Sequence, residues 1–191
     1  MEQLPYEDLY KLSREINNHK MDIGKIMHSA IAQSGRIVGV KQGIIVTFED
    51  DESIEHAYVL HADGSVDDST QLWETLLTFG IIGFVFYAHR TVVIQNLATD
   101  PRWAGLPRRA NMPQEGSAVG VPLFRDTVVF GVMMFIHPKV GYFDEDMIKI
   151  LEEIAGLTAS ALNITADRTG PESGRMRYQT VFDDSVVPML L

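Results

Sequence analysis

The chain has 191 residues, 46% of them hydrophobic and 22% charged, which suits one globular domain with flanking segments, because single domains typically span ~100–150 residues. Sixteen basic and 26 acidic residues give a net charge of −10, a field that repels nucleic acids and anionic membranes. The absence of cysteine excludes disulfides, thiolate metal sites and thiol nucleophiles, and no apolar run reaches the ~18 residues of a membrane span. Since no signal-peptide pattern is present, we expect a cytoplasmic protein that binds no nucleic acid and does not insert into a membrane.

The N-terminal part of the sequence predicts two helices. Pro5 suits a first helical turn, and the apolar residues after it recur at helical spacing. These residues are Tyr6, Leu9, Leu12 and Ile16. A second helix is predicted over residues 21–34, where the glycines Gly35 and Gly39 end the pattern.

The next segments predict a hairpin and a further helix. Residues 43–48 and 54–61 have strand composition, and the acidic turn at 49–52 joins them into an antiparallel pair. The helix that follows would be capped by Asp68 or Ser69 and would carry an apolar stripe. That stripe consists of Leu72, Leu76 and Phe79.

The second half of the sequence predicts a short strand, a long loop, a hairpin and a final helix. The strand covers residues 91–95, and the loop at 96–115 shows no helical or strand period. In the hairpin strands, 117–123 and 127–136, apolar residues occupy both alternating sets of positions. A sheet with one solvated face alternates apolar with polar residues, so this pattern indicates a sheet that is covered on both faces.

The order of these signals resembles the GAF domain. The matching features are the glycines Gly80 and Gly83, the apolar run 92–94 followed by Asp100-Pro101-Arg102-Trp103, the strand 117–123 with Pro122, then Gly131 and Phe143. The resemblance covers roughly residues 20–166. It divides the chain into a linker or dimerisation helix at 1–19, a GAF-like domain at 20–168 and a final segment at 169–191.

The resemblance implies an α/β (α+β) fold, in which helices cover both faces of an antiparallel sheet of five to six strands. It also implies a small-molecule site on the face that the helical region 72–87 and the loop 96–115 would cover. The candidate ligand-binding residues are Phe84, Tyr87, Ile94, Arg102, Trp103, Ser117 and Val119, with Arg102 as a partner for an anion. In the alternative interpretation of the loop, Asp100 caps a short turn, Trp103 anchors it by burial and the arginines are solvated.

Specialised branches of the GAF family use chemistry that this sequence lacks. Bilin-binding members attach their chromophore through a cysteine, and the branch that reduces free methionine sulfoxide works through cysteines, so both are excluded. Cyclic-nucleotide-binding members carry an Asn-Lys pair, which is absent here. Asp144 and Glu145, which follow Phe143 directly, are better explained as helix-capping residues.

The six histidines give no metal-binding pattern. His56 and His61, five residues apart on a predicted strand, would point to opposite faces. Some GAF domains carry haem, for which His61, His89 or His137 is a candidate ligand, but no second feature accompanies any of them. We therefore expect neither haem nor another metal, and no visible absorbance from the purified chain.

The final helix is predicted to begin near Asp144 and to end before Gly170, a length of about 37 Å at 1.5 Å per residue. Its apolar stripe predicts a contact with a second copy in a homodimer, as between paired linker helices. The candidate interface residues are Leu9, Leu12, Ile16, Leu151, Ile154 and Leu162. In the alternative, the stripe packs against the chain's own helix at 6–16, and both contacts can coexist.

Residues 175–191 resemble the truncated start of a PAS domain, with Tyr178, Phe182, Asp184, Ser185 and Pro188 in order. The two resemblances together imply a non-catalytic sensory domain of a larger protein, such as a histidine kinase of a two-component system or a cyclic-di-nucleotide synthase. This domain would bind a small molecule and relay the signal through its terminal helices. In the alternative, it is a ligand-free dimerisation and relay module whose pocket is filled by its own side chains.

Overall fold

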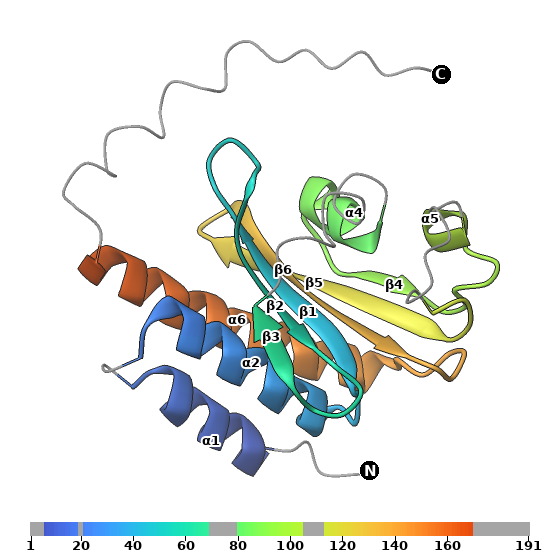
Figure 1. Ribbon diagram of the computed structural model, residues 1–191, viewed down its shortest axis with the longest axis horizontal. Coiled ribbons are helices and arrows are strands. Elements are labelled where there is room, and N and C mark those ends of the chain that lie inside the picture. Colours follow the sequence, from blue (N-terminus) through green and yellow to red (C-terminus); the bar gives the residue numbers. More distant parts are fainter. Residues whose placement is uncertain (1–5, 19–20, 69–79, 105–112, 170–191) are drawn as a thin grey trace.

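The computed structural model describes residues 6–18, 21–68, 80–104 and 113–169. Among them, six strands form one antiparallel sheet in the order β3-β2-β1-β6-β5-β4 (Figure 1). The strands are β1 Gln42–Phe48, β2 Ile54–Leu60, β3 Val66–Asp68, β4 Val92–Ile94, β5 Ser117–Arg125 and β6 Val128–His137. This confirms the predicted antiparallel sheet of five to six strands.

Helices lie on both faces of the sheet, as predicted. α2 Ile23–Ile37 and α6 Glu145–Thr169 cover one face, α1 Tyr6–Ile16 packs on these two helices, and α4 Ile81–Ala88 covers the other face (Figure 1). α5 Pro101–Ala104 is a single turn on the α4 side, after β4. None of the helices in the described part of the chain is both long and apolar enough to span a membrane.

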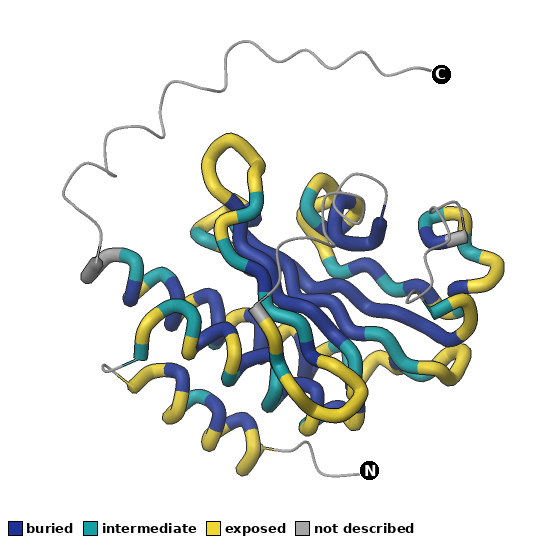
Figure 2. Tube along the Cα trace, viewed as in Figure 1, coloured by how far each residue is buried: buried dark blue, intermediate teal, exposed yellow. Residues whose placement is uncertain are grey.

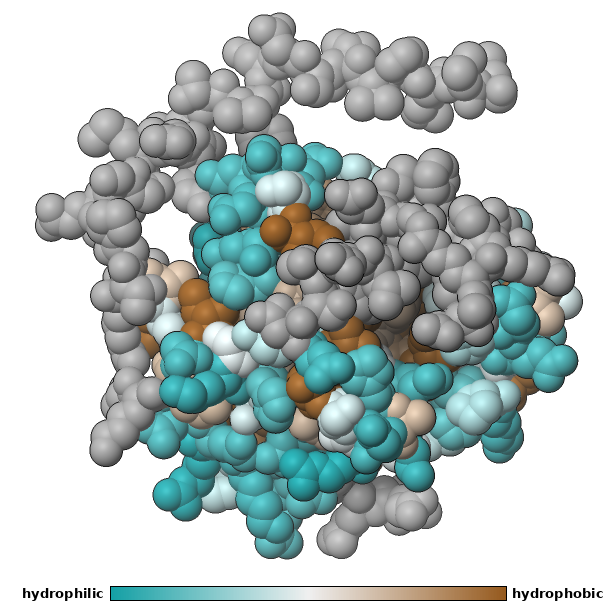
Figure 3. All heavy atoms as spheres, viewed as in Figure 1, coloured by the Kyte–Doolittle hydropathy of each residue, from teal (hydrophilic) through white to brown (hydrophobic). Residues whose placement is uncertain are grey.

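Two hydrophobic clusters, one on each face, hold the layers together. The pleat of β5 separates them, because Val119 and Val121 belong to the cluster beneath α2 and α6, whereas Ala118 belongs to the cluster beneath α4. Burial is concentrated in the central strands, and exposure in the hairpin ends (Figure 2). On the face shown in Figure 3, the hydrophobic residues of the described part occur in small separate areas among hydrophilic ones.

An aspartate side chain caps the N-terminus of each of the two long helices. Asp22 caps α2 by accepting a hydrogen bond from the Lys25 amide at 2.8 Å. Asp144 caps α6 in the same way, from the Met147 amide at 2.9 Å, which confirms its predicted capping role.

The end of α2 differs from the prediction, because the helix continues through Gly35 to Ile37. Gly35 serves close packing instead: a Cβ atom there would lie 2.5 Å from Leu60 Cδ2 and 2.7 Å from the Val40 carbonyl oxygen. The turn falls at Gly39, whose φ of +70° favours glycine.

β3 was not predicted. It has three residues, and Val66 is its one apolar member, so alternation is too short to indicate a strand. Asp68, a predicted helix cap, ends this strand. The helix predicted around Leu72 and Leu76 lies outside the described residues.

Candidate functional site

The α4 face of the sheet, where the resemblance implies a ligand, is apolar throughout its described core. Its buried residues are Ile44, Val46, Phe48, Ala57, Ile81, Ile82, Val85, Val92, Ile94, Leu97, Trp103, Ala118, Val129, Val132 and Met134. α4 packs closely on β5, since a Cβ atom at Gly120 would lie 2.7 Å from Val85 Cγ2. A ligand group inserted among these residues would meet hydrocarbon and no charge.

The structure brings together two of the seven predicted ligand-binding residues. Ile94 and Trp103 both lie in the α4-side cluster, 0% and 4% exposed. Phe84 and Tyr87 are 45% and 70% exposed, on the outer side of α4, because Val85 and two isoleucines occupy its inner side. These two aromatic side chains therefore point away from the described core.

Ser117 and Val119 belong to the opposite side of the sheet. Val119 lies in the cluster beneath α2 and α6. The Ser117 hydroxyl donates to the Lys139 carbonyl oxygen at 2.8 Å and accepts from the Tyr142 amide at 3.2 Å. Ser117 thus fixes the loop that leads from β6 into α6.

Arg102 is already paired with an anion, the carboxylate of Asp100. Its Nε donates to Asp100 Oδ1 at 2.8 Å, and its Nη2 donates to Asp100 Oδ2 at 2.5 Å and to the Val93 carbonyl oxygen at 3.1 Å. Hydrogen bonds from the Arg102 guanidinium lower the pKa of Asp100, and those same bonds raise the pKa of Arg102. The pair therefore stabilises the fold above the ordinary pKa of aspartate, and that contribution is lost as the pH falls through the lowered value.

Trp103 anchors the segment after β4. Its side chain is buried, and its Nε1–H donates to the Pro113 carbonyl oxygen at 2.9 Å. The Asp100 carboxylate also accepts from the Arg102 amide at 2.9 Å, which caps the short turn of α5. These contacts match the alternative interpretation of the loop for Asp100 and Trp103, whereas Arg102 is ion-paired and its side chain is only 32% exposed.

The histidines considered for haem lie at separate places. His61 Nε2 is 3.0 Å from Asp67 Oδ2 on the β2–β3 hairpin, and His89 follows α4 with a φ of 50°. His137 stacks on Tyr142 with ring centroids 3.4 Å apart, and burial lowers the pKa of His137. Within the described ranges, no three His, Asp or Glu side chains group closely enough to hold a metal ion.

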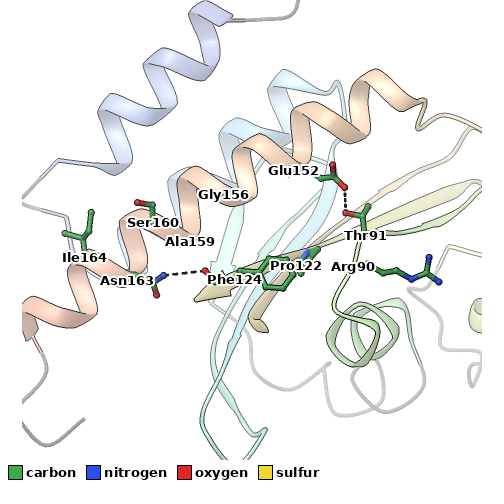
Figure 4. Close-up of a pocket in the computed structure, with 10 residues that line it drawn as sticks. All are labelled: Arg90, Thr91, Pro122, Phe124, Glu152, Gly156, Ala159, Ser160, Asn163 and Ile164. Carbon is green, nitrogen blue, oxygen red and sulfur yellow. Dashed lines mark hydrogen bonds between the residues drawn. The ribbon is translucent and has the colours of Figure 1, made fainter. Parts of the chain in front are cut away.

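A groove that the sequence did not indicate runs between α6 and the edge of the sheet (Figure 4). It has a volume of about 590 Å³. Its lining residues are Arg90, Thr91, Pro122, Phe124, Glu152, Gly156, Ala159, Ser160, Asn163 and Ile164. Hydrogen bonds lie at both ends: Thr91 Oγ1 donates to Glu152 Oε1 at 2.5 Å, and Asn163 Nδ2 donates to the Phe124 carbonyl oxygen at 3.5 Å.

β4 connects the two sides of the sheet. It follows α4 after three residues and pairs with β5 at the edge of the sheet. Thr91, just before β4, bonds to Glu152 of α6. The backbone carbonyl oxygen of Gln95, just after β4, accepts a hydrogen bond from the Gly141 amide at 2.9 Å. The Gln95 side chain donates through Nε2 to the Phe143 carbonyl oxygen at 3.4 Å. β4 is thus bonded at both ends to α6 or to the loop before it.

The residues predicted for a dimer interface are all buried within one chain, between 0% and 7% exposed. They are Leu9, Leu12, Ile16, Leu151, Ile154 and Leu162, and all belong to the cluster beneath α2 and α6. The stripe on the final helix therefore packs on the chain's own core, and a contact between copies would need other residues.

Solved structures share the fold at low sequence identity. The GAF domain of an Acinetobacter phosphoenolpyruvate-protein phosphotransferase has a TM-score of 0.66 and 16% identity, over 90% of this chain and 99% of that chain. The free methionine-R-sulfoxide reductase from Neisseria meningitidis has a TM-score of 0.64 and 16% identity, over 85% and 90%. The nlh2 GAF domain of A. aeolicus has a TM-score of 0.59 and 12% identity, over 83% and 95%.

No curated protein matches the sequence. The family model of the GAF domain, however, matches residues 20–163, which is most of the chain. The chain therefore belongs to the GAF domain family, a group of sensory and regulatory modules found in signalling proteins.

Proposed function

We propose that this domain is a cytoplasmic, non-catalytic sensor that binds a small molecule on the α4 side of the sheet, beneath the segment 96–115. Binding of that molecule would then change the position of α6. Family membership supports a regulatory role. Two similar structures are free methionine-R-sulfoxide reductases, but this chain has no cysteine with which to perform that chemistry. The resemblance of residues 175–191 to the start of a PAS domain supports a larger sensor, with a histidine kinase or a cyclic-di-nucleotide synthase as its output.

The observation that carries the proposal is that β4 follows α4 after three residues and is hydrogen-bonded at both ends to α6 or to the loop before α6. Displacement of α4 by a ligand would pull on β4, because residues 89–91 are the whole connection between them. β4 in turn is bonded to α6 through Thr91 and Glu152, and to the start of α6 through Gln95 and Phe143. A movement of α4 would therefore reach α6 through β4, which lies at the edge of the sheet.

The chemistry of the α4 side favours one class of ligand. The described core has no charged side chain, so a charged group placed there would lose its hydration without a partner. Arg102, the cation nominated for an anion, already donates to Asp100. These observations favour a ligand with a largely apolar contact surface over a cyclic nucleotide.

The ligand-free alternative has observations of its own. Phe48 and Phe86 pack edge to face with ring centroids 4.7 Å apart, and Trp103 is buried in the same cluster. Val85 of α4 also packs directly on Gly120 of β5, with no space between the two residues at this position. In this alternative the domain's own side chains fill the pocket, and the module relays mechanical changes only.

Native mass spectrometry of the full chain tests ligand binding. We expect a co-purified small molecule at one per chain, and we expect Ala118→Leu to lose it, because the added carbons enter the α4-side core. Val140→Leu, which also adds a carbon but at a position 51% exposed, should retain it. A chain that purifies empty, and whose thermal midpoint does not rise with the apolar probes indole and decanol, would favour the ligand-free alternative.

A further inference from the structure

The groove between α6 and the sheet edge is large enough for a small organic molecule. Its volume of about 590 Å³ lies within the ~300–1,000 Å³ that is usual for ligand pockets. Pro122 and Ala159 are buried, Phe124 and Ile164 are 38% and 43% exposed, and all four line the groove (Figure 4). None of the lining residues belongs to the α4-side cluster. The groove is therefore a separate place, with an apolar lining that a molecule from solution can reach.

A glycine inside α6 keeps this groove open. Gly156 is exposed in the interior of the helix, where glycine is destabilising relative to alanine. A Cβ atom at Gly156 would have no packing neighbour within 4 Å among the described residues. At Gly35 and Gly120, by contrast, a Cβ atom would collide with a neighbour. Packing within the chain thus does not account for Gly156, and its missing side chain leaves space for another molecule.

The end of the groove next to β4 presents a carboxylate. Glu152 Oε1 accepts from Thr91 Oγ1 at 2.5 Å, and in the described ranges no basic side chain forms an ion pair with Glu152. Arg90 lines the same end, but its guanidinium points away from the Glu152 carboxylate (Figure 4). The chain also carries a net charge of −10, which attracts cations and repels anions. This end therefore favours a positively charged group.

We propose that the α6 groove, lined by Phe124, Glu152, Gly156 and Ile164 among others, binds a small arylalkyl amine. Its ammonium group donates to the Glu152 carboxylate, a charge-assisted hydrogen bond. Its ring lies over Gly156, where contact with Phe124 and Ile164 removes apolar surface from water. Glu152 and Gly156 are four residues apart on one side of α6, so the two groups of the ligand need a separation of about one helical turn, ~5.4 Å. A two-carbon link between ring and nitrogen meets this requirement.

The amine would bind at the contact between β4 and α6. Thr91, just before β4, donates to the same carboxylate that the ammonium group would bind. A second donor on Glu152 would compete with the Thr91 hydroxyl and weaken this contact. The α6 groove would thus let a second molecule adjust the proposed relay, although binding in the groove does not depend on the relay or on a ligand on the α4 side.

Amide chemical-shift titrations of the full chain with three matched compounds test the site. We expect 2-phenylethylamine to shift amides around Glu152 and Gly156, with a dissociation constant below about 1 mM, as suits a ligand of this size. Its neutral isostere 2-phenylethanol and the anion 3-phenylpropanoate should bind at least tenfold more weakly, because neither brings a positive charge to Glu152. Equal or tighter binding of the anion would overturn the proposal.

Glu152→Gln and Glu153→Gln are a matched pair of variants. Both remove one negative charge from an exposed position of α6, but Glu152 lines the groove and Glu153 does not. The glutamine carbonyl oxygen at position 152 can still accept from Thr91. We expect Glu152→Gln to weaken 2-phenylethylamine at least tenfold and Glu153→Gln less than twofold. Equal weakening by both would mean that the amine responds to the net charge alone, and would overturn the site.

Gly156→Leu fills the groove without entering the core, because the new side chain starts in open space. We expect it to weaken the amine at least tenfold with an equal or higher thermal midpoint, since leucine is the better helix former. Unchanged binding to Gly156→Leu, or shift changes confined to the α4 side around Val85 and Ala118, would overturn the proposal. So would sedimentation velocity that shows a wild-type dimer and a Gly156→Leu monomer, because a second copy would then occupy the groove.

Discussion

Trp103→Ala is expected to lower the free energy of unfolding by ~3–5 kcal/mol, the usual cost of removing a buried large aromatic side chain. Trp103 is 4% exposed and lies in the α4-side cluster with Ile94 and Leu97. Its Nε1–H also donates a hydrogen bond to the Pro113 carbonyl oxygen. Urea unfolding followed by far-ultraviolet circular dichroism measures the loss without relying on tryptophan fluorescence.

Trp103→Phe separates packing from hydrogen bonding. It keeps most of the buried surface and removes the N–H donor, so a smaller loss of about 1 kcal/mol is expected. If Trp103 also closes a ligand site, the alanine variant should lose more stability with the co-purified molecule present than without it. An equal loss in both conditions would leave Trp103 as an anchor alone, and a loss below about 1 kcal/mol would contradict the burial described above.

Gly116→Ala is expected to be among the most destabilising single substitutions in the described chain, with a loss above about 4 kcal/mol. The φ of Gly116 is +112°, and a Cβ atom there would lie 2.2 Å from the His137 carbonyl oxygen and 2.9 Å from Pro138 Cα. Both neighbouring atoms belong to the backbone, so the start of β5 would have to separate from the end of β6.

Gly64→Ala is the matched control for this prediction. Gly64 also has a positive φ, +87°, but nothing lies within 4 Å of an added Cβ atom. It should therefore show backbone strain alone, about 1–2 kcal/mol. Equal losses for Gly64→Ala and Gly116→Ala in urea unfolding would mean that the collision at His137 is relieved without cost.

The sequence predicted the layers of the fold because the apolar patterns of the long strands and helices extend over many residues. The two apolar sets in residues 117–136 indicated a sheet covered on both faces, and the helices observed on both faces confirm this. β3 and α5 have three and four residues, too few for any period to stand out. β4 also has three residues, but all three are apolar, and this run was enough to predict it.

The candidate ligand residues were harder to place, because an element that is apolar on all sides does not indicate which face of the sheet each side chain is on. α4 is apolar on nearly every side, so nothing in its sequence indicated that Phe84 and Tyr87 would face outward. Both faces of β5 are apolar as well, so alternation could not assign Val119 to the α6 side. By contrast, the pairing of Arg102 with Asp100, two residues away, is a local signal that the sequence does contain.

The stripe on the final helix shows a related limit. Leu151, Ile154 and Leu162 indicate correctly that one side of the helix is buried, but the pattern is the same whether the partner is α2 or a second copy.

The central claim is that β4 couples the α4 side of the sheet to α6, and amide chemical shifts test it most directly. Gly120→Ala pushes α4, because the new Cβ atom would lie 2.7 Å from Val85 Cγ2. Shifts should then change at amides around Glu152, and Thr91→Val, which removes the hydroxyl bonded to Glu152, should strongly reduce those changes in the double variant. Gly120→Ala spectra with α6 amides unmoved, or moved equally with and without the Thr91 hydroxyl, would contradict the coupling.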